Sequence, residues 1–321
     1  MFKEFDVVVV GELNVDIIMD QIEGLPAIGK EIIAEKMNFT LGSSTAIFAN
    51  NIATLGARVC FVGKLGLDSF GYFIKETLDK KGIDTSQIVM SSELKTGATI
   101  VLNFDEDRAN VTFPGAMNDL SLSDIKDECL AKARHIHISS IFLQKSLLPG
   151  LSKLLAKAKA LGLTTSIDPQ WDPQERWDID MDLLMSLIDV FLPNAAELIN
   201  LTHAKDLGEA LDKIKKYDQT TIVIKNGHEG ALLWDGKILI HQPVFSNQNV
   251  IDAIGAGDSF DAGYIKKFLE GCSAKECLEY GSLMGAINTT GYGGTSSFSS
   301  LEKVNQIAQS VFNYSDYVTE G

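Results

Sequence analysis

The sequence predicts an α/β fold, in which a doubly wound, mostly parallel β-sheet is sandwiched by helices and carries a small β-strand lid. Three observations favour it. Runs rich in β-branched residues alternate along the chain with helix-like runs. The first run, residues 6–10 (DVVVV), is continuously apolar, which is typical of a strand buried on both faces. Residues 31–41 and 96–113 interrupt the alternation with strand-like patterns.

The elements of the main sheet follow in chain order. We expect its strands at residues 6–10, 59–63, 135–139, 163–168, 189–193 and 221–225. We expect helices at residues 45–56, 69–82, 148–162, 181–188 and 206–217. The first two of these helices close on Gly56 and Gly82, and glycine is favoured where a helix ends.

The interrupting stretches predict a lid. Strands that leave a parallel sheet can fold over its ligand-binding edge, although an ordinary edge hairpin would give the same pattern. No internal repeat or linker divides the 321 residues. We therefore expect a single domain over residues 1–321, with lid strands from about 12–20, 31–41 and 96–114.

Charge and composition exclude several classes of partner. A net charge of −15 disfavours nucleic acid and anionic membranes. The start of the chain, MFKEFDVVVVG, does not resemble a signal peptide, and no apolar stretch is long enough to span a membrane, so we expect a cytoplasmic protein. Cysteines at 60, 129, 272 and 277 lack C-x-x-C spacing, and we interpret them as reduced structural thiols.

Two histidines share one face of an expected strand. His135 and His137 alternate in RHIHIS. They are candidate ligands for a metal or a substrate, but a packed or solvated pair is the favoured interpretation.

Two nucleotide-binding patterns are absent or misleading. Residues 24–31 (GLPAIGKE) match G-x-x-x-x-G-K, but Glu31 stands where a P-loop needs a Ser or Thr for Mg²⁺. Strand-like residues follow, so a turn into the lid is favoured. The first strand is followed by a single glycine, Gly11, which disfavours a dinucleotide-binding site.

The strongest candidate for chemistry is residues 251–260, IDAIGAGDSF. Gly255 and Gly257 permit a tight turn at the start of a helix, where N–H groups converge on an anion. Such a turn stabilises charge on a transferring phosphoryl group. Asp258 would then be the general base that takes a proton from a substrate hydroxyl. The plain alternative is that Asp258 is only a helix N-cap.

DAIGAGDSFDAG resembles the C-terminal signature of the ribokinase-like, or PfkB-type, carbohydrate kinases. Four further stretches resemble the family in the same order. They are VVVVGELNVD, TLGSSTAIFANNIATLGARVCFVGKLGLDSFG, LPNAAE and VIKNGHEGAL. The resemblance covers nearly the whole chain, and it implies ATP, Mg²⁺ and a small-molecule sugar substrate.

The resemblance also implies roles for individual residues. Asp258 is the base, and the amides of Gly255, Ala256 and Gly257 form the anion hole. Asn194 and Glu197 organise Mg²⁺ through water, although N-A-A-E alone is also a helix capping box. The residues implied for ATP are Asn194, Lys225, Asn226, Gly227, Gly257 and Asn288. The residues implied for a possible K⁺ ion are Asp252, Ile254 and Ser297, and Ala253 replaces the usual Thr beside them.

The substrate end departs from the family pattern G-G-x-x-x-N. Ser43 replaces the second glycine, and Ile47 replaces the sugar-contacting Asn. A hydroxyl left without a polar partner there disfavours ribose itself. The candidate substrate contacts are Asn14, Asp16, Gly42, Ser43, Ser44, Arg108 and Asp168. Arg108 would pair with a carboxylate or phosphate, unless it is simply a solvated loop arginine.

These observations predict an ATP-dependent kinase that phosphorylates a hydroxyl, expected to be primary, of a small sugar or sugar acid. A nucleoside kinase of the same family is the alternative. A sugar-binding sensor without turnover is disfavoured by the intact site, and hydride transfer by the missing dinucleotide fingerprint. Because lid strands often pair across a dimer in this family, we expect a homodimer through the lid.

Overall fold

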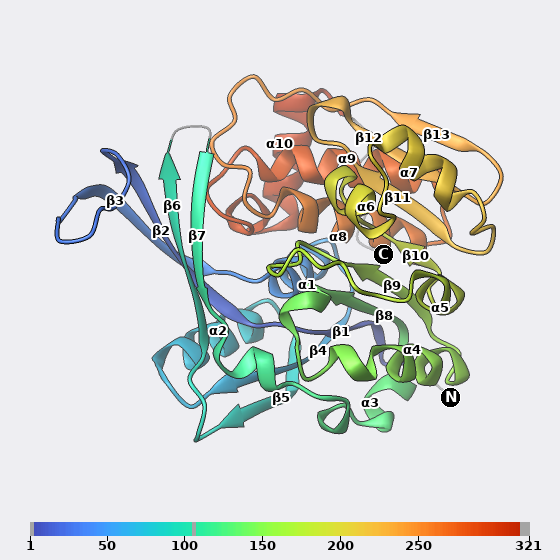
Figure 1. Ribbon diagram of the computed structural model, residues 1–321, viewed down its shortest axis with the longest axis horizontal. Coiled ribbons are helices and arrows are strands. Elements are labelled where there is room, and N and C mark those ends of the chain that lie inside the picture. Colours follow the sequence, from blue (N-terminus) through green and yellow to red (C-terminus); the bar gives the residue numbers. More distant parts are fainter. Residues whose placement is uncertain (1–2, 105–106, 315–321) are drawn as a thin grey trace.

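The computed structural model describes residues 3–104 and 107–314 (Figure 1). Its main sheet has the strand order β13-β12-β11-β10-β9-β8-β1-β4-β5. From β11 to β5 neighbouring strands are parallel, and the hairpin of β12 and β13 is antiparallel. The expected doubly wound sheet is confirmed. The strands are β1 Phe5–Val10, β4 Val59–Gly66, β5 Asp84–Ser91, β8 Ala133–Ser139, β9 Thr164–Asp168, β10 Val190–Phe191, β11 Thr221–Lys225, β12 Ala231–Trp234 and β13 Leu239–Gln242.

Helices cover both faces of this sheet. They are α1 Ser44–Thr54, α2 Ser69–Lys80, α3 Asp127–Ala131, α4 Leu151–Ala160, α5 Met181–Leu187, α6 Ala195–Leu201, α7 Leu207–Ile214, α8 Ala256–Leu269, α9 Ala274–Asn288 and α10 Leu301–Phe312. Each of the five helices expected from the sequence is present within a few residues of its expected ends. The strand β5, the hairpin β12–β13 and the helices α3, α9 and α10 were not expected.

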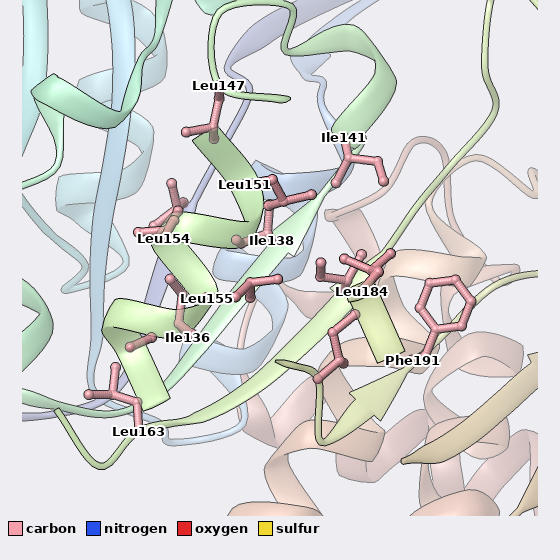
Figure 2. Close-up of a cluster of buried hydrophobic side chains, with 14 of the residues drawn as sticks. Ile136, Ile138, Ile141, Leu147, Leu151, Leu154, Leu155, Leu163, Leu184 and Phe191 are labelled. Carbon is pink, nitrogen blue, oxygen red and sulfur yellow. The ribbon is translucent and has the colours of Figure 1, made fainter. Parts of the chain in front are cut away.

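The alternation of side chains along β1 explains its unbroken apolar sequence. Val8 and Val10 belong to a core with α3 to α7, whereas Val7 and Val9 belong to a second core with α1, α2, α8 and α9. Figure 2 shows part of the first core, where Leu154 and Leu155 of α4 lie over Ile136 and Ile138 of β8. A strand packed by helices on both faces needs apolar residues at every position.

The lid is a separate sheet that projects to one side of the molecule (Figure 1). Its strands are β2 Asn14–Ile22, β3 Ala34–Leu41, β6 Gly97–Phe104 and β7 Asp107–Phe113, in the order β3-β2-β6-β7. The edge-hairpin alternative is wrong, because β2 pairs with β6 in parallel and none of these strands joins the main sheet. Residues 24–31 lie in the turn between β2 and β3, and they precede a strand rather than a helix.

The two histidines form a buried chain of hydrogen bonds between β8 and β9. His135 contacts the hydroxyls of Thr164 at 2.8 Å and Ser166 at 2.7 Å. His137 contacts the hydroxyls of Ser166 at 2.7 Å and Ser139 at 2.8 Å. Both imidazoles are fully buried. The interpretation as a packed pair is therefore confirmed, and the solvated one is wrong.

Among the described residues, the structure contains no helix that is both long and apolar enough to cross a membrane.

The buried histidines should make stability depend on pH. Burial lowers the pKa of His135 to about 3 and also lowers the pKa of His137, so both stay neutral in the folded chain while the unfolded chain protonates them below about pH 6.5. Unfolding then takes up protons, and stability falls as the pH falls. Relative to His135→Asn, the wild-type free energy of unfolding should fall by roughly 1.4 kcal/mol per pH unit between pH 6 and 5.

Urea unfolding at several pH values measures this difference, and other titrating groups contribute equally to both proteins. His241→Asn, an exchange at an exposed position, is the matched control and should run parallel to wild type. Parallel curves for His135→Asn would contradict a neutral buried imidazole.

Candidate active site

Two cavities meet at the first turn of α8. The first has a volume of about 680 Å³, lies between the lid and the main sheet, and is lined in part by Gly255 and Asp258. The second has a volume of about 430 Å³ and is lined in part by Ala256 and Gly257. Consecutive residues of one helical turn therefore face two different pockets, as a group transferred from one ligand to another requires.

A positive backbone angle starts α8. Gly255 is the N-cap residue with φ of 76°, a conformation that side chains with a Cβ rarely adopt. A Cβ at Gly255 would also lie 2.5 Å from the Cα of Gly294. In this turn the N–H of Ala256 already donates to the carbonyl of Ala253 at a long 3.3 Å. The start of a helix generally presents N–H groups that can receive an anion.

Asp258 is the third residue of this helix rather than its cap, so the plain N-cap alternative is wrong. It is 6% exposed and lines the larger cavity. The side chain of Gln170 donates a hydrogen bond to its carboxylate at 3.1 Å. This placement leaves a carboxylate at the boundary of the two pockets, where a general base for an attacking hydroxyl must stand.

Behind the turn lies a buried cluster of charges. The ammonium of Lys225, at the end of β11, forms ion pairs with Asp168 at 2.9 Å and Asp261 at 3.0 Å. Burial alone would lower the pKa of Lys225, but the attraction of the two carboxylates outweighs it and raises the pKa. Lys225 also lines the smaller cavity. A fixed positive charge thus lies beside the expected anion site.

The position of Asp168 corrects one expectation. Asp168 was expected to contact the substrate, but it is fully buried and is not among the residues lining the larger cavity. Its carboxylate instead accepts from Lys225 and, at 2.6 Å, from the amide of Gln170. Because Gln170 also contacts Asp258, Asp168 acts on the site through another side chain.

The capping box at the start of α6 is present. Asn194 accepts from the amide of Glu197 at 2.9 Å, and the Glu197 carboxylate accepts from the amide of Asn194 at 2.8 Å. A backbone bridge to Lys225 places Asn194 beside the charge cluster. Burial, then the negative charge of Asp168, raises the pKa of Glu197 to about 7.

This cluster contains oxygen atoms of the kind that bind Mg²⁺. Three buried carboxyl groups, those of Asp168, Glu197 and Asp261, accompany the ammonium of Lys225. Burial raises the pKa of Asp261 as well. Carboxylate and amide oxygens are the ligands that Mg²⁺ prefers, and it keeps several of its waters. Among the described residues, no group of three or more His, Cys, Asp and Glu side chains is arranged to hold a metal ion directly. The magnesium role expected of Asn194 and Glu197, which acts through water, stays a prediction.

The substrate end lies where the chain passes from β1 of the main sheet into β2 of the lid. A Cβ at Gly42 would collide with the carboxylate of Asp16 and lie 2.6 Å from Oδ1 of Asn14, so glycine is required there. The Asn14 amide donates to the hydroxyl of Thr99 at 2.7 Å. Its Oδ1 is buried without a partner, which leaves an acceptor for a substrate hydroxyl.

Ser43 lies at the position where the resemblance described above led us to expect glycine. Its φ is 73°, in the left-handed region that costs a non-glycine residue roughly 1–2 kcal/mol. The hydroxyl compensates by donating to the carbonyl of Glu12 at 2.7 Å and accepting from the amide of Ala46 at 3.2 Å. Ser44 follows as the first residue of α1 and lines the larger cavity.

Ile47 contributes an apolar part of the cavity wall. It is 3% exposed and lines the larger cavity, as its position in the motif implied. Its side chain also fills the space beside Gly255 and Gly294. An asparagine here would meet these glycines rather than open solvent, so the apolar residue suits its surroundings.

Sequence reasoning missed Glu12. This residue follows β1, is 3% exposed and lines the larger cavity with Asp16 and Asp258. Its carboxylate accepts from the amide of Ser44 at 3.0 Å. Burial raises its pKa to about 7, opposed first by a hydrogen bond from Ser140. An acid directly after a central strand, at the ligand-binding edge, was the available signal.

The remaining candidates fall into three groups. Asn226 and Gly227 line the smaller cavity, as expected for nucleotide contacts. Asn288 does not line it in the described structure: it is fully buried and donates to the Ile254 carbonyl at 2.6 Å. We expected Asn288 to contact ATP directly. In the structure its side chain instead supports the turn before α8. The side chain of Arg108 lies outside the described part of the chain, although its backbone belongs to β7.

The expected potassium residues are brought close to the glycine-rich loop. Asp252 accepts from the amides of Ile254 at 2.9 Å and Gly293 at 2.8 Å. The hydroxyl of Ser297 contacts that of Thr290 at 3.1 Å. All of these oxygens, with the Ile254 carbonyl, already have hydrogen-bond partners, so a K⁺ site stays a prediction.

Comparison with known proteins identifies the family of this chain. The model of the pfkB family carbohydrate kinases matches residues 4–301. The chain belongs to this family.

Named relatives agree with that assignment. The chain is 30% identical over 287 residues to ribokinase of Arabidopsis thaliana, covering 85% of this chain and 73% of that protein. It is 28% identical over 275 residues to 2-dehydro-3-deoxygluconokinase of Bacillus subtilis, covering 82% and 85%. The structure of the Arabidopsis ribokinase with ribose and ATP is similar, with a TM-score of 0.80, 25% identity and coverage of 96% and 99%.

As a pfkB family member, this protein is a sugar kinase, a phosphotransferase that acts on a hydroxyl group. The interpretations as a silent sensor and as a hydride-transfer enzyme are set aside.

The hydrogen bonds of Ser43 generate a prediction. Ser43→Ala keeps the strained backbone and loses both bonds of the hydroxyl, so it should lower the free energy of unfolding by roughly 1–3 kcal/mol. Ser43→Gly also loses the bonds but relieves the strain, and should cost no more than about 1 kcal/mol. Chemical denaturation of both variants measures the difference. Equal losses would contradict the argument that backbone strain matters at this turn.

Proposed function

We propose that this protein transfers the γ-phosphoryl group of ATP to a primary hydroxyl of a small neutral sugar, with Asp258 as the general base. One observation carries the proposal. The first turn of α8 separates two cavities, with Gly255 and Asp258 facing one and Ala256 and Gly257 facing the other. The larger cavity is assigned to the sugar and the smaller to the nucleotide.

The reaction follows from this arrangement. The carboxylate of Asp258 accepts the proton of the substrate hydroxyl while that oxygen attacks the γ-phosphorus and ADP leaves. The amides of Gly255, Ala256 and Gly257 hold the phosphoryl oxygens, and Lys225 adds a fixed positive charge. Mg²⁺, held through water by Asn194 and Glu197, would neutralise phosphate charge. The lid excludes water, so that the sugar rather than water accepts the phosphate.

The smaller cavity suits a nucleotide. Val244, Val250 and Phe260 supply apolar walls for a base, while Asn226 and Gly227 supply polar groups near Lys225. Asn288 supports this site from behind, through Ile254. We assign a possible K⁺ ion to Asp252, Ile254 and Ser297.

The charges of the larger cavity favour a neutral substrate over a sugar acid. Its described lining includes the carboxyl groups of Glu12, Asp16 and Asp258, against one cation, the exposed Lys145. The buried Oδ1 of Asn14 adds another acceptor. A wall rich in acceptors binds hydroxyl donors and repels a carboxylate. A substrate with its carboxylate deep in this cavity is therefore disfavoured, although one relative is named as a kinase of 2-dehydro-3-deoxygluconate.

A nucleoside is the second candidate substrate, and the apolar residues favour it. Ile47, Val101, Phe142 and Trp171 line the same cavity and offer surfaces for a planar base. The volume of about 680 Å³ accommodates either substrate.

We also propose that two copies pair through their lids. Met37, Phe39, Val111 and Phe113 are large apolar lid residues that are at least 40% exposed. Light scattering of the purified protein tests this proposal, which predicts a dimer mass, whereas a monomer mass at micromolar concentration would contradict it.

The proposed mechanism predicts the effect of Asp258→Asn. The amide keeps the shape of the side chain but cannot accept the proton, so kcat should fall by roughly 10²- to 10⁴-fold with little change in KM. ADP release with Mg-ATP measures this against neutral pentoses, hexoses, polyols, their sugar acids and nucleosides. Asp182→Asn, at a surface ion pair, is the control and should keep wild-type kcat. Wild-type kcat in Asp258→Asn would overturn the base assignment, and preference for sugar acids would overturn the substrate class.

Glu12 predicts a second kinetic effect. Its pKa of about 7 means that it ionises as the pH rises through neutrality, next to Asp16 and Asp258. Added negative charge should hinder the approach of the phosphoryl group, so wild-type kcat/KM should decline above about pH 7. Glu12→Gln, which stays neutral, should abolish that decline. Identical pH profiles for the two proteins between pH 6 and 9 would contradict the assignment.

A further inference from the structure

Two cysteines far apart in sequence meet in the interior. Cys60 belongs to β4 and Cys129 to α3, and their Sγ atoms lie 3.4 Å apart. They are 1% and 6% exposed. Cys272 and Cys277 are the matched comparison: the thiol of Cys277 contacts the carbonyl of Cys272 at 3.7 Å rather than its sulfur. All four are free cysteines, as the sequence predicted, but one pair is placed to react with itself.

The pair lies away from the kinase chemistry. Cys60 is the second residue of β4 and pairs with Val8 and Asp84 near the amino ends of the parallel strands. The sugar and nucleotide cavities lie at the opposite, carboxyl end of the sheet, and neither is lined by these cysteines in the described structure. The thiols therefore have no part in the mechanism proposed above.

A small surface cavity borders both cysteines. Cys60 and Cys129 line a surface cavity of about 110 Å³, together with Asp84, Lys126 and Lys132. This volume admits a molecule as small as hydrogen peroxide.

The groups around Cys60 and Cys129 give the two thiols different chemical properties. The hydrogen bond between them lowers the pKa of Cys129, and Lys132 and Lys126 lower it further against burial and Asp84. The same hydrogen bond, followed by burial, raises the pKa of Cys60. A thiolate is the nucleophile of thiol chemistry. Cys129 lies in α3 between Lys126 and Lys132, which cap that helix and line the same cavity, so we assign Cys129 as the thiol that reacts first. Burial raises the pKa of Cys277 to about 12, so that thiol stays protonated.

We propose that Cys60 and Cys129 form a peroxide-responsive dithiol that closes reversibly to a disulfide. The Cys129 thiolate attacks one oxygen of hydrogen peroxide, the O–O bond breaks, and hydroxide leaves as water after taking a proton, which gives a sulfenic acid. The sulfur of Cys60, losing its proton, then attacks the sulfur of Cys129 and displaces a second water. Two thiols are oxidised and one peroxide is reduced to two waters. A dithiol reductant reverses the step by thiol–disulfide exchange.

The geometry allows closure with a small movement. The sulfurs must approach from 3.4 Å to the ordinary bond length of about 2.05 Å. Cys129 lies in a helix of five residues, which can adjust more easily than the central strand that carries Cys60. The closed bond would join the ends of residues 60–129, a segment that carries α2, β5 and the lid strands β6 and β7. Such a cross-link restricts the unfolded chain and stabilises the fold.

Peroxide treatment of the purified full-length protein tests the proposal. After quenching, unreacted thiols are alkylated in denaturant, and peptides are mapped with and without dithiothreitol. Wild type should lose two of its four alkylatable thiols and yield a reducible peptide pair that contains Cys60 and Cys129. Its melting temperature should rise by on the order of 5 °C and return after reduction. Kinase activity should stay within about twofold, because the sulfurs lie away from both cavities.

Single variants separate the two steps. Cys60→Ser should accumulate a sulfenic acid on Cys129, which dimedone traps, whereas Cys129→Ser should form neither adduct nor disulfide. Cys272→Ser/Cys277→Ser is the control and should behave as wild type. Four alkylatable thiols in peroxide-treated wild type would overturn the proposal, as would a disulfide that involves Cys272 or Cys277. Both of these outcomes are measured on wild type, so poor folding of a variant does not remove the test.

Discussion

The active site depends on a close backbone contact between the turn before α8 and the glycine-rich loop after α9. A Cβ on Gly255 would lie 2.5 Å from the Cα of Gly294, and a Cβ on Gly294 would collide with the side chain of Ile47. Asn51 of α1 secures the contact by donating to the Gly294 carbonyl at 2.9 Å and to the Ser259 hydroxyl at 2.8 Å. Asn288 completes it through the Ile254 carbonyl. These buried polar groups are all paired with one another, which fixes the start of α8 at the boundary of the two cavities.

The parts of the structure that line the larger cavity and those that line the smaller cavity meet at this turn before α8. Ile47 of α1 lies in the wall of the larger cavity, which we assign to the sugar, and also packs against Gly255 and Gly294. Ser43 and Ser44, just before it, are bonded to Glu12 after β1. The elements that would hold the sugar and those that would hold the phosphates therefore share one packed boundary. A group transferred between ligands needs this rigidity, because misplacement by an ångström weakens catalysis strongly.

The local pattern of apolar residues and glycines in the sequence predicted much of this architecture. The continuous apolar run of β1 reflects packing on both faces, and the glycines around Asp258 reflect the backbone angle that starts α8. The lid stretches were recognised because they lack the helical period, but their pairing order depends on contacts between distant strands. The capping box of Asn194 and Glu197 was equally visible in the sequence.

Other parts of the site depend on partners far away in the chain. Asp168 has the residue type of a substrate contact, yet Lys225, 57 positions later, occupies its carboxylate. Asn288 lies near the expected loop, yet its side chain points to Ile254, 34 positions earlier. Glu12 was overlooked because its significance comes mainly from burial beside other acids, and its place directly after β1 was the one local signal. The 3.4 Å contact of Cys60 and Cys129 likewise joins residues 69 positions apart.

The central claim is that Asp258 faces the acceptor hydroxyl across the boundary between two cavities. The most direct measurement is a crystal structure of the enzyme with a non-hydrolysable ATP analogue, Mg²⁺ and the preferred sugar. Our account predicts one sugar hydroxyl within hydrogen-bond distance of the Asp258 carboxylate and the terminal phosphate at the amides of residues 255–257. A sugar whose hydroxyls all lie away from Asp258, or a terminal phosphate bound elsewhere, would contradict it.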